Sequence, residues 1–274
     1  MGANTKIAWA HHTFNPWYGC QKVSHGCDHC YAESWGRRFG VTNWGKSCTR
    51  KRSSSANWKT PLAWNDEAAR KGIRYRVFCA SLGDVFDNAV PESWRTDLFV
   101  LIRKTPNLDW LLLTKRIGNA DRMIAEAVGA LPPDEKCGTG QWPWENVWLG
   151  ITVCNQDEAD RDIPKLLNLH AKVRWLSMEP LLGDISFVGM FANPDCIYDG
   201  TNALQKIDWL IVGGESGAQA RPMHPDWVRS LRDQCAAVDT PFLFKQWGTA
   251  KNQRGGYGRE LDGRLHDGYP QEAA

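Results

Sequence analysis

Residues 15–32 read NPWYGCQKVSHGCDHCYA and place three cysteines, Cys20, Cys27 and Cys30, within eleven residues. Two residues separate Cys27 from Cys30, so their thiolates can bind one metal centre from a single turn of chain, and Cys20 can reach it from the preceding loop. An iron-sulfur cluster of four irons (4Fe-4S) offers one corner to each thiolate. Three cysteines would therefore leave one iron open to a substrate or cofactor.

Zinc is the alternative metal, because it also favours paired cysteines combined with imidazole. The histidines near the three cysteines are His11, His12, His25 and His29. A disulfide is disfavoured, since the nine cysteines are an odd number and several lie among apolar neighbours, as thiols do in a reducing compartment. No long apolar run follows residues 1–6, so we expect no signal peptide and a cytoplasmic protein.

Short apolar, aromatic-rich runs recur along the rest of the chain. They occupy residues 75–80, 109–113, 147–153, 173–176, 208–212 and 242–244. These runs lack strict polar alternation, which is typical of strands covered on both faces. Amphipathic segments at 91–104, 119–128, 157–169 and 225–238 lie between them. This alternation, with a first strand over 7–14, predicts six to seven parallel strands in a full or partial TIM-type (β/α) barrel.

The length and composition favour one large domain. The chain has 274 residues, of which 42% are hydrophobic, enough for a substantial core. We therefore expect a single α/β domain over 1–274, with the cysteine loop at 15–32, an irregular insertion at about 40–66 and a polar C-terminal tail from about 249. No run of eighteen apolar residues is present, so we expect no membrane span.

The net charge of +2 does not by itself indicate a polyanionic partner. A local basic run extends from Arg37 to Arg52, however, with Trp44 and Trp58 nearby. Such a run is typical either of a solvated loop or of a phosphate-binding surface. Both interpretations stay open from the sequence.

Polar side chains follow each predicted strand. In an α/β barrel the C-terminal ends of the strands share one rim, where the active site forms. The cysteine loop follows the first strand and is expected on the same rim. The other rim candidates are Ser81, Asp84, Lys115, Arg116, Thr152, Asn155, Glu179, Glu215, Lys245 and Gln246.

The cysteine loop resembles that of radical S-adenosylmethionine (SAM) enzymes, most of all the branch near spore photoproduct lyase, in its Asn-Pro-aromatic-x-Gly-Cys start and Cys-Tyr-Ala end. The whole chain resembles a phage-associated three-cysteine-motif family of formerly unknown function. The matching segments are 13–33, 111–116, 148–156, 174–182, 208–225 and 242–248. One feature departs from the common CxxxCxxC spacing, because six residues separate Cys20 from Cys27.

The resemblance implies a 4Fe-4S cluster held by Cys20, Cys27 and Cys30, and reductive cleavage of SAM with an electron from a donor such as flavodoxin or ferredoxin. The residues expected to contact SAM are His29, Ser81, Asp84, Thr152, Asn155 and Glu179. The candidates for contact with the substrate or for catalysis are Lys115, Arg116, Glu215 and Lys245.

The expected substrate is a nucleic acid or nucleotide, since cations on the rim can hold phosphates; a partner protein is also considered. Two other functions stay open. One is an iron-sulfur redox or binding protein that does not cleave SAM. The other is a zinc-dependent nucleic-acid-binding module.

Overall fold

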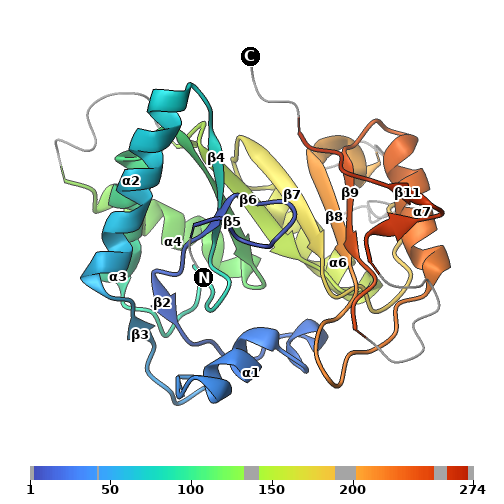
Figure 1. Cartoon of the computed structure of the whole chain (residues 1–274), viewed down its shortest axis with the longest axis horizontal. Coiled ribbons are helices and arrows are strands. Elements are labelled where there is room, and N and C mark those ends of the chain that lie inside the picture. The colour runs from blue at the N-terminus through green and yellow to red at the C-terminus, as the bar shows by residue number, and fades with distance from the viewer. Residues whose placement is uncertain (1–2, 42, 133–141, 189–201, 250–257, 271–274) are drawn as a thin grey trace. The chain divides into compact units, whose positions relative to one another are not determined.

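The computed structural model describes residues 3–41, 43–132, 142–188, 202–249 and 258–270 (Figure 1). Seven strands form one sheet in the order β1-β4-β5-β6-β7-β8-β9. β1 pairs with β4, β4 with β5, β7 with β8 and β8 with β9, all in parallel. The strands follow one another in chain order with helices between them, and β1 and β9 are the two ends of the sheet. The predicted α/β fold is confirmed as a partial TIM-type barrel.

The sheet strands are β1 (His12–Thr13), β4 (Tyr75–Cys79), β5 (Leu108–Thr114), β6 (Val147–Thr152), β7 (Val173–Met178), β8 (Trp209–Gly213) and β9 (Phe242–Gln246). The helices are α1 (Tyr31–Arg38), α2 (Ser55–Lys71), α3 (Glu92–Arg103), α4 (Ile117–Gly129), α6 (Gln156–Leu167) and α7 (Pro225–Ala236). A short antiparallel pair joins β2 (Trp17–Tyr18) to β3 (Lys51–Arg52).

The chain divides into two compact units. The first comprises Met1–Val23, Cys30–Leu149 and Leu169–Lys172, and holds β1 to β5 with α1 to α4. The second comprises Ser24–His29, Gly150–Asn168 and Val173–Ala274, and holds β7 to β11 with α6 and α7. The division falls inside β6. The expectation of a single domain stays a prediction.

The first unit is built on β4 and β5, whose Val77, Trp110 and Leu111 are fully buried. The prediction of irregular structure over 40–66 is wrong for its second half, where α2 begins at the N-cap Ser54. The buried residues of α2 recur at helical spacing, at Pro61, Trp64 and Ala68. The first strand is also shorter than predicted, because Ala10 N donates to Ile7 O in a turn and only His12–Thr13 pairs with β4.

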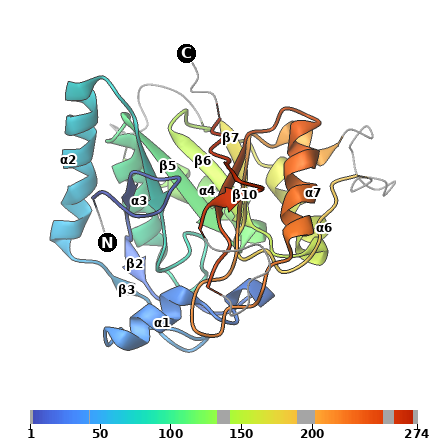
Figure 2. The same cartoon turned by 45° about the vertical axis from the view of Figure 1, so that its right-hand side comes forward.

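The second unit includes the C-terminal hairpin of β10 (Glu260–Leu261) and β11 (Arg264–Leu265), which the sequence had suggested was a polar tail. Leu261 is fully buried, and Trp247 Nε1 donates to Glu260 O at 2.8 Å. Asp262 in the turn pairs with Arg229 and Arg232 of α7, so the hairpin lies beside α7 in both views (Figures 1 and 2). Residues 250–257 and 271–274 of the expected tail lie outside the described parts.

None of the helices in the described residues is both long enough and apolar enough to cross a membrane.

Gly150 in β6 gives a test of packing in the second unit. A Cβ at this position would lie 2.2 Å from the ring of the fully buried Trp175. We expect Gly150→Ala to lower the free energy of unfolding by about 1–3 kcal/mol, because a rigid indole has to move in a packed core. Urea denaturation measures this change. Gly118→Ala in α4 is the matched control, since no atom outside its chain neighbours and the nearby helix backbone lies within 4 Å of the new Cβ. Equal stabilities of the two variants would contradict the packing.

Candidate functional site

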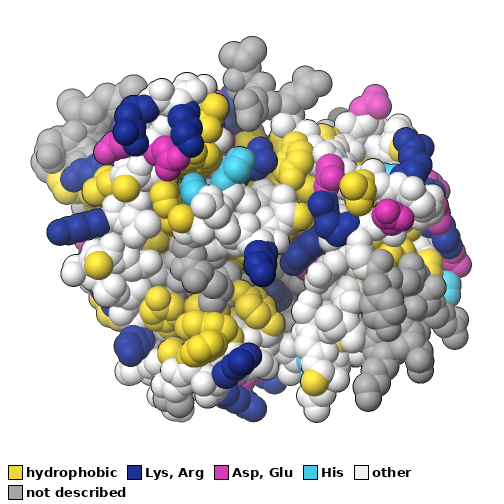
Figure 3. Space-filling model, in the orientation of Figure 1, with side chains coloured by type: hydrophobic (Ala, Val, Ile, Leu, Met, Phe, Trp, Pro, Cys, Tyr) yellow, Lys and Arg dark blue, Asp and Glu magenta, His cyan; other side chains and the backbone are white. Residues whose placement is uncertain are grey.

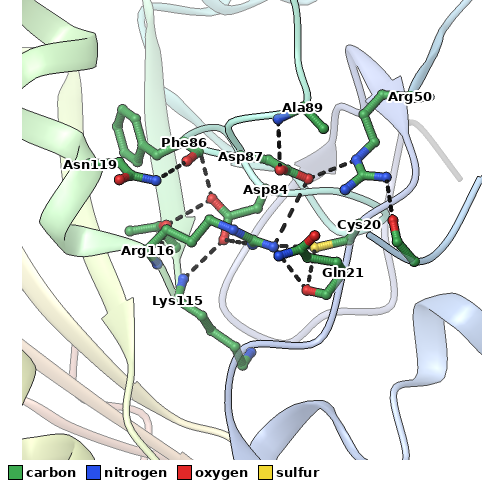
Figure 4. A network of polar contacts seen from close by, with 12 residues as sticks. Cys20, Gln21, Arg50, Asp84, Phe86, Asp87, Ala89, Lys115, Arg116 and Asn119 are labelled. Atoms are coloured by element: carbon green, nitrogen blue, oxygen red, sulfur yellow. Dashed lines mark hydrogen bonds and ion pairs between the residues drawn. The ribbon is translucent and has the colours of Figure 1, made fainter. Parts of the chain in front are cut away.

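The end of β4 is joined to the end of β5 by the carboxylate of Asp84 (Figure 4). One oxygen accepts hydrogen bonds from Thr114 Oγ1 at 2.7 Å and Phe86 N at 2.9 Å. The other accepts from Lys115 N at 3.0 Å and Arg116 Nη1 at 3.1 Å. Asp84 is 5% exposed. Four donors of the chain itself therefore fix this carboxylate, and it in turn orients Arg116.

Arg116 connects this carboxylate to the cysteine loop. Its Nη1 lies 3.4 Å from Cys20 Sγ, and its Nη2 donates to Gln21 O at 2.8 Å. Burial acts to lower the pKa of Arg116, but Asp84, Cys20 and Asp87 outweigh it and hold that pKa above its ordinary value. A buried, fully charged guanidinium thus lies against the sulfur of Cys20.

The Cys20 thiol is protonated at neutral pH in the metal-free protein. Burial, followed by the charge of Asp84, raises the pKa of Cys20 to about 11, although Arg116 acts in the opposite direction. Displacement of this proton by a metal would bring a thiolate next to Arg116. Arg116 was a candidate for substrate contact from the sequence, and the structure gives it these internal partners.

A second buried ion pair supports the loop that follows α1. Arg50 Nε donates to Asp87 Oδ2 at 2.7 Å, and the two side chains are 0% and 3% exposed. Arg50 Nη1 donates to three carbonyls of residues 43–48. Asp87 also lies 4.0 Å from Arg116. Arg50, which belongs to the basic run, is therefore an internal residue and cannot bind phosphate at the surface.

Gly19 lets the chain enter the cysteine loop. Its φ is +105°, in the region that favours glycine, and a Cβ there would lie 2.2 Å from Asn43 O. Gly19 N donates to Leu82 O, and Gly45 N donates to Cys20 O. Backbone bonds on both sides therefore hold Cys20 in place.

Cys30 occupies the N-cap position of α1. Cys27, in the second unit, ends a single 3-10 turn (His25–Cys27) and is buried, with Ser24 Oγ at 3.8 Å from its sulfur. All three cysteines are free thiols, so their donor chemistry fits an iron-sulfur cluster. Among the described residues, no three His, Cys, Asp or Glu side chains are close enough together to hold a metal ion.

In the second unit, Glu215 follows β8 and binds Arg221 through the backbone and side chain. Glu215 Oε2 also lies 3.1 Å from His29 Nδ1. Burial raises the pKa of Glu215, but hydrogen bonds from Arg221 and His29 outweigh it and hold that pKa below its usual value. The carboxylate is therefore ionised at neutral pH.

Arg221 also binds the cysteine loop, since its Nη2 donates to His25 O at 2.9 Å and its Nη1 lies 3.4 Å from Asp28. The sequence had identified His29 and Glu215 separately, and the structure brings them together. The sequence analysis did not identify Arg221 or Asp28 as site residues. The only signal for Arg221 was its place in the matching segment 208–225.

The ends of β7 and β9 also meet within the second unit. Lys245 Nζ forms an ion pair with Glu179, whose other oxygen lies 3.4 Å from Ser177 Oγ. A Cβ at Gly213 of β8 would lie 3.1 Å from Glu179 Oε2, so the glycine leaves room for this pair. Two residues predicted for different roles, Glu179 and Lys245, are thus direct partners.

Three other predicted rim residues have clear structural contacts. Ser81 Oγ lies 3.0 Å from Asn15 Nδ2, and Asn155 caps α6 by accepting from Glu158 N. Gln246 Nε2 donates to Ser216 Oγ at 2.7 Å. Thr152 is buried at the end of β6. Asn155 therefore has a full explanation as a helix cap.

Two of the histidines considered for zinc belong to the packing around β1. His11 Nδ1 accepts from Arg76 N at 2.8 Å, and His12 Nδ1 accepts from Asn4 N at 3.2 Å. His12 is stacked on Trp64, and burial, followed by the charge of His11, lowers the pKa of His12 to about 4. Both rings therefore have a role in the structure that does not involve a metal.

A family model matches residues 4–270 of this chain. The chain belongs to the family described as "Protein of unknown function (DUF5131)". No curated protein matches it.

Among solved structures, the chain is similar to a spore photoproduct lyase mutant with bound AdoMet and dinucleoside spore photoproduct, at 11% identity and a TM-score of 0.43. That match covers 85% of this chain, which spans 63% of the length of the lyase. It is also similar to a citrate lyase from Burkholderia xenovorans, at 12% identity and a TM-score of 0.33, over 87% of this chain and 74% of that one.

The Glu215–Arg221 pair predicts a pH-dependent contribution to stability. We expect Arg221→Gln to lower the free energy of unfolding by about 1–2 kcal/mol at pH 7, because a buried carboxylate loses charged donors. The folded-state pKa of Glu215 is below its ordinary 4.5, so this stabilisation is present above that pH and is lost as the pH falls through the folded value. Urea denaturation between pH 7 and pH 3 measures it.

The control is Arg122→Gln, which removes an exposed pair with Glu126 on α4 and should change stability by less than about 0.5 kcal/mol. A difference between wild type and Arg221→Gln that stays constant with pH would rule out the charged pair as its source.

Proposed function

We propose that this chain is a radical SAM enzyme that binds a 4Fe-4S cluster through Cys20, Cys27 and Cys30. The observation that carries the proposal is the environment of the three thiols in the NPWYGCQKVSHGCDHCYA stretch. Cys20 faces a buried guanidinium, Cys30 lies at a helix N-terminus, Cys27 is buried, and all three are free. Metal binding displaces the thiol protons, and the resulting thiolates are the ligands that such clusters require. The thiolate of Cys20 would then face the guanidinium of Arg116.

The cluster and SAM, when bound, would supply the radical chemistry, with one electron from a flavodoxin- or ferredoxin-type donor yielding methionine and a 5'-deoxyadenosyl radical from SAM. The protein residues would bind and orient. Arg116 donates to the sulfur of Cys20, and Asp84 fixes the direction of that guanidinium. Hydrogen bonds to ligand sulfurs are one of the means by which a protein sets the potential of a cluster.

Different roles are proposed for the strand-end residues. Ser81, Asp84 and Asn155 would position their neighbours through the hydrogen bonds that they form within the chain. Thr152, Glu179 and His29 are the candidates for contact with SAM, and Glu179 and His29 are themselves paired with Lys245 and Glu215. The half-buried Lys245, paired with Glu179, and Lys115 are the candidates for holding an anionic substrate, for which we propose a nucleic acid or nucleotide.

An iron-sulfur redox or binding protein that does not cleave SAM is the second candidate. The observation that favours it is the gap of six residues between Cys20 and Cys27. Production of 5'-deoxyadenosine separates the two functions. Anaerobically reconstituted protein is mixed with SAM and dithionite, and the products are measured by liquid chromatography with mass spectrometry. A brown, iron-loaded protein that forms no 5'-deoxyadenosine would favour the second candidate.

The three cysteines are expected to act as one unit. Replacement of Cys20, Cys27 or Cys30 by Ala should remove most of the bound iron, because two thiolates leave a cluster open to loss. Cys48→Ala is the control and should keep its iron, since Cys48 lies outside the motif. Iron and sulfide assays after anaerobic reconstitution measure the result. Full iron content in the Cys20 variant would show that the ligand assignment is wrong.

Arg116 is expected to raise the reduction potential of the bound cluster, because its positive charge near Cys20 favours the reduced form. Arg116→Gln should retain iron and shift the potential to a more negative value, by about 60 mV if the lost interaction is worth about 1.4 kcal/mol. A redox titration followed by electron paramagnetic resonance measures the shift. Arg116→Lys keeps the positive charge next to Asp84 and should therefore have a potential close to that of the wild type.

Arg122→Gln is the control for the loss of an arginine remote from Cys20 and should leave the potential unchanged. If wild-type protein binds no iron, the proposed function fails. If it binds iron and Arg116→Gln has the wild-type potential, only the role of Arg116 is wrong.

A further inference from the structure

Helix α1 carries a row of aromatic side chains at every fourth residue. Tyr31, Trp35 and Phe39 follow this spacing, which places them on one side of the helix, with Phe39 at its C-cap. Tyr31 is 47% exposed and Phe39 58%. The rings of Trp35 and Phe39 are 4.9 Å apart between centroids, and Tyr18 of β2 stacks against Trp35 at 6.3 Å. The first unit therefore has a group of aromatic side chains on one side of α1, of which Tyr31 and Phe39 are exposed to solvent.

Cations border this aromatic surface. The guanidinium of Arg38 lies 5.7 Å from the centroid of the Phe39 ring. Lys51 of β3 pairs directly with Tyr18 of β2, so the exposed Lys51 side chain leaves the ribbon on the same face as Tyr18. Figure 3 shows hydrophobic side chains gathered near β2 and α1 with Lys and Arg beside them. Two of the aromatic residues thus have a neighbouring cation.

Acidic side chains add little negative charge here. Glu33 is the acidic residue of α1, its side chain is 18% exposed, and it is paired with Arg37 at 2.7 Å and with Lys22 at 4.0 Å. The side chains of Arg37 and Lys22 are themselves 77% and 53% exposed. The charge of this surface is therefore positive, which is complementary to a polyanion.

The aromatic residues that the sequence had associated with the basic run, Trp44 and Trp58, are half-buried and packed against other parts of the first unit. The ring of Trp44 packs on α1 at Gly36, where a Cβ would lie 2.3 Å from it. Trp58 packs edge-on against Phe14 and lies under Arg52, at 4.4 Å from guanidinium to ring centroid. Tyr31 and Phe39 are therefore the more exposed rings of this region.

We propose that the surface formed by Tyr18, Tyr31, Trp35, Arg38, Phe39 and Lys51, called here the α1 surface, binds single-stranded nucleic acid. Exposed rings next to cations match a strand in which each nucleotide offers a base to stack and a phosphate to pair. A duplex keeps its bases stacked inside and cannot use the rings. An acidic protein would satisfy the charge but not this alternation of ring and cation.

The α1 surface begins next to the proposed cluster site, because Tyr31 directly follows Cys30. The inference rests on the proposed function only for the choice of substrate class, and it deepens that choice by naming the surface. A strand bound on α1 would be held close to the last cysteine of the motif.

The test uses the full chain, reconstituted and in the metal-free form, with a fluorescein-labelled single-stranded oligonucleotide of about 16 nucleotides and its duplex. Fluorescence anisotropy is measured at several salt concentrations. We expect the single strand to bind more tightly than the duplex, and the affinity to fall with salt as phosphate contacts are lost. Tyr31→Ala and Phe39→Ala should each weaken binding about 5- to 150-fold, the loss of one stacked base.

Arg38→Gln should weaken binding and reduce the salt slope by about one phosphate contact. Leu62→Ala is the matched control, since Leu62 is 38% exposed on α2 and should leave binding unchanged. Wild-type affinity in both aromatic variants, equal binding of single strand and duplex, or no binding would overturn the proposal. Equal competition by polyglutamate would overturn it in favour of an acidic protein partner.

Failure of the two proposals can be told apart. If the protein binds no cluster or forms no 5'-deoxyadenosine, but the metal-free form still binds the strand, the enzyme function is wrong and the α1 surface is supported. If 5'-deoxyadenosine forms normally but no strand binds, the enzyme function is supported and the α1 surface is wrong.

Discussion

The buried ion pair between Asp84 and Arg116 is the constraint on which the first unit depends. Removing two charges from water is costly, and attraction offsets that cost only when the remaining donors and acceptors are also satisfied. Here the carboxylate accepts four hydrogen bonds, and the guanidinium reaches Cys20 and Gln21 O as well. The same pair thus fixes two strand ends and the entrance to the cysteine loop. Removal of one partner from such a buried pair typically costs about 3–5 kcal/mol.

The second unit uses a related arrangement. Glu215 follows β8, binds Arg221, and Arg221 donates to His25 O, as Arg116 donates to Gln21 O in the first unit. In each unit an arginine fixed by a strand-end carboxylate holds a carbonyl of its own part of the cysteine loop. The arginines differ in exposure, with side chains 7% exposed for Arg116 and 30% for Arg221. Water screens Arg221 more, so its pair contributes less to stability.

Much of the fold was predictable because parallel strands buried on both faces appear in the sequence as short apolar runs. The run at 75–80 corresponds to β4 at Tyr75–Cys79, and 208–212 to β8 at Trp209–Gly213. The helix α2 was missed because its polar residues and Pro61 resemble a loop, while the apolar side it buries depends on contacts with β4 and β5. Local composition could not show that contact.

The pairing of the candidate site residues could not be predicted from the sequence. Asp84, Arg116, Glu179, Glu215 and Lys245 were all identified as strand-end residues, because the barrel topology places such residues on one edge. Their roles depend on which side chain reaches which, and those pairs are 66 residues apart for Glu179 and Lys245 and 32 for Asp84 and Arg116. Arg50 shows the same limit, since its sequence neighbours made it part of a basic run while Asp87 draws it into the interior.

Most large aromatic side chains of the sheet are buried, whereas two rings of α1 are exposed. Trp17, Trp110, Trp175 and Trp209 are fully buried, so a large part of the aromatic content serves the core. A single exposed apolar side chain on a protein surface needs no explanation, but a row of rings at helical spacing bordered by cations does. The Glu33 side chain of the same helix is 18% exposed and is paired with Arg37, which is 77% exposed. Helix α1 therefore keeps the charge of Arg37 in water while Tyr31 and Phe39 also reach the surface.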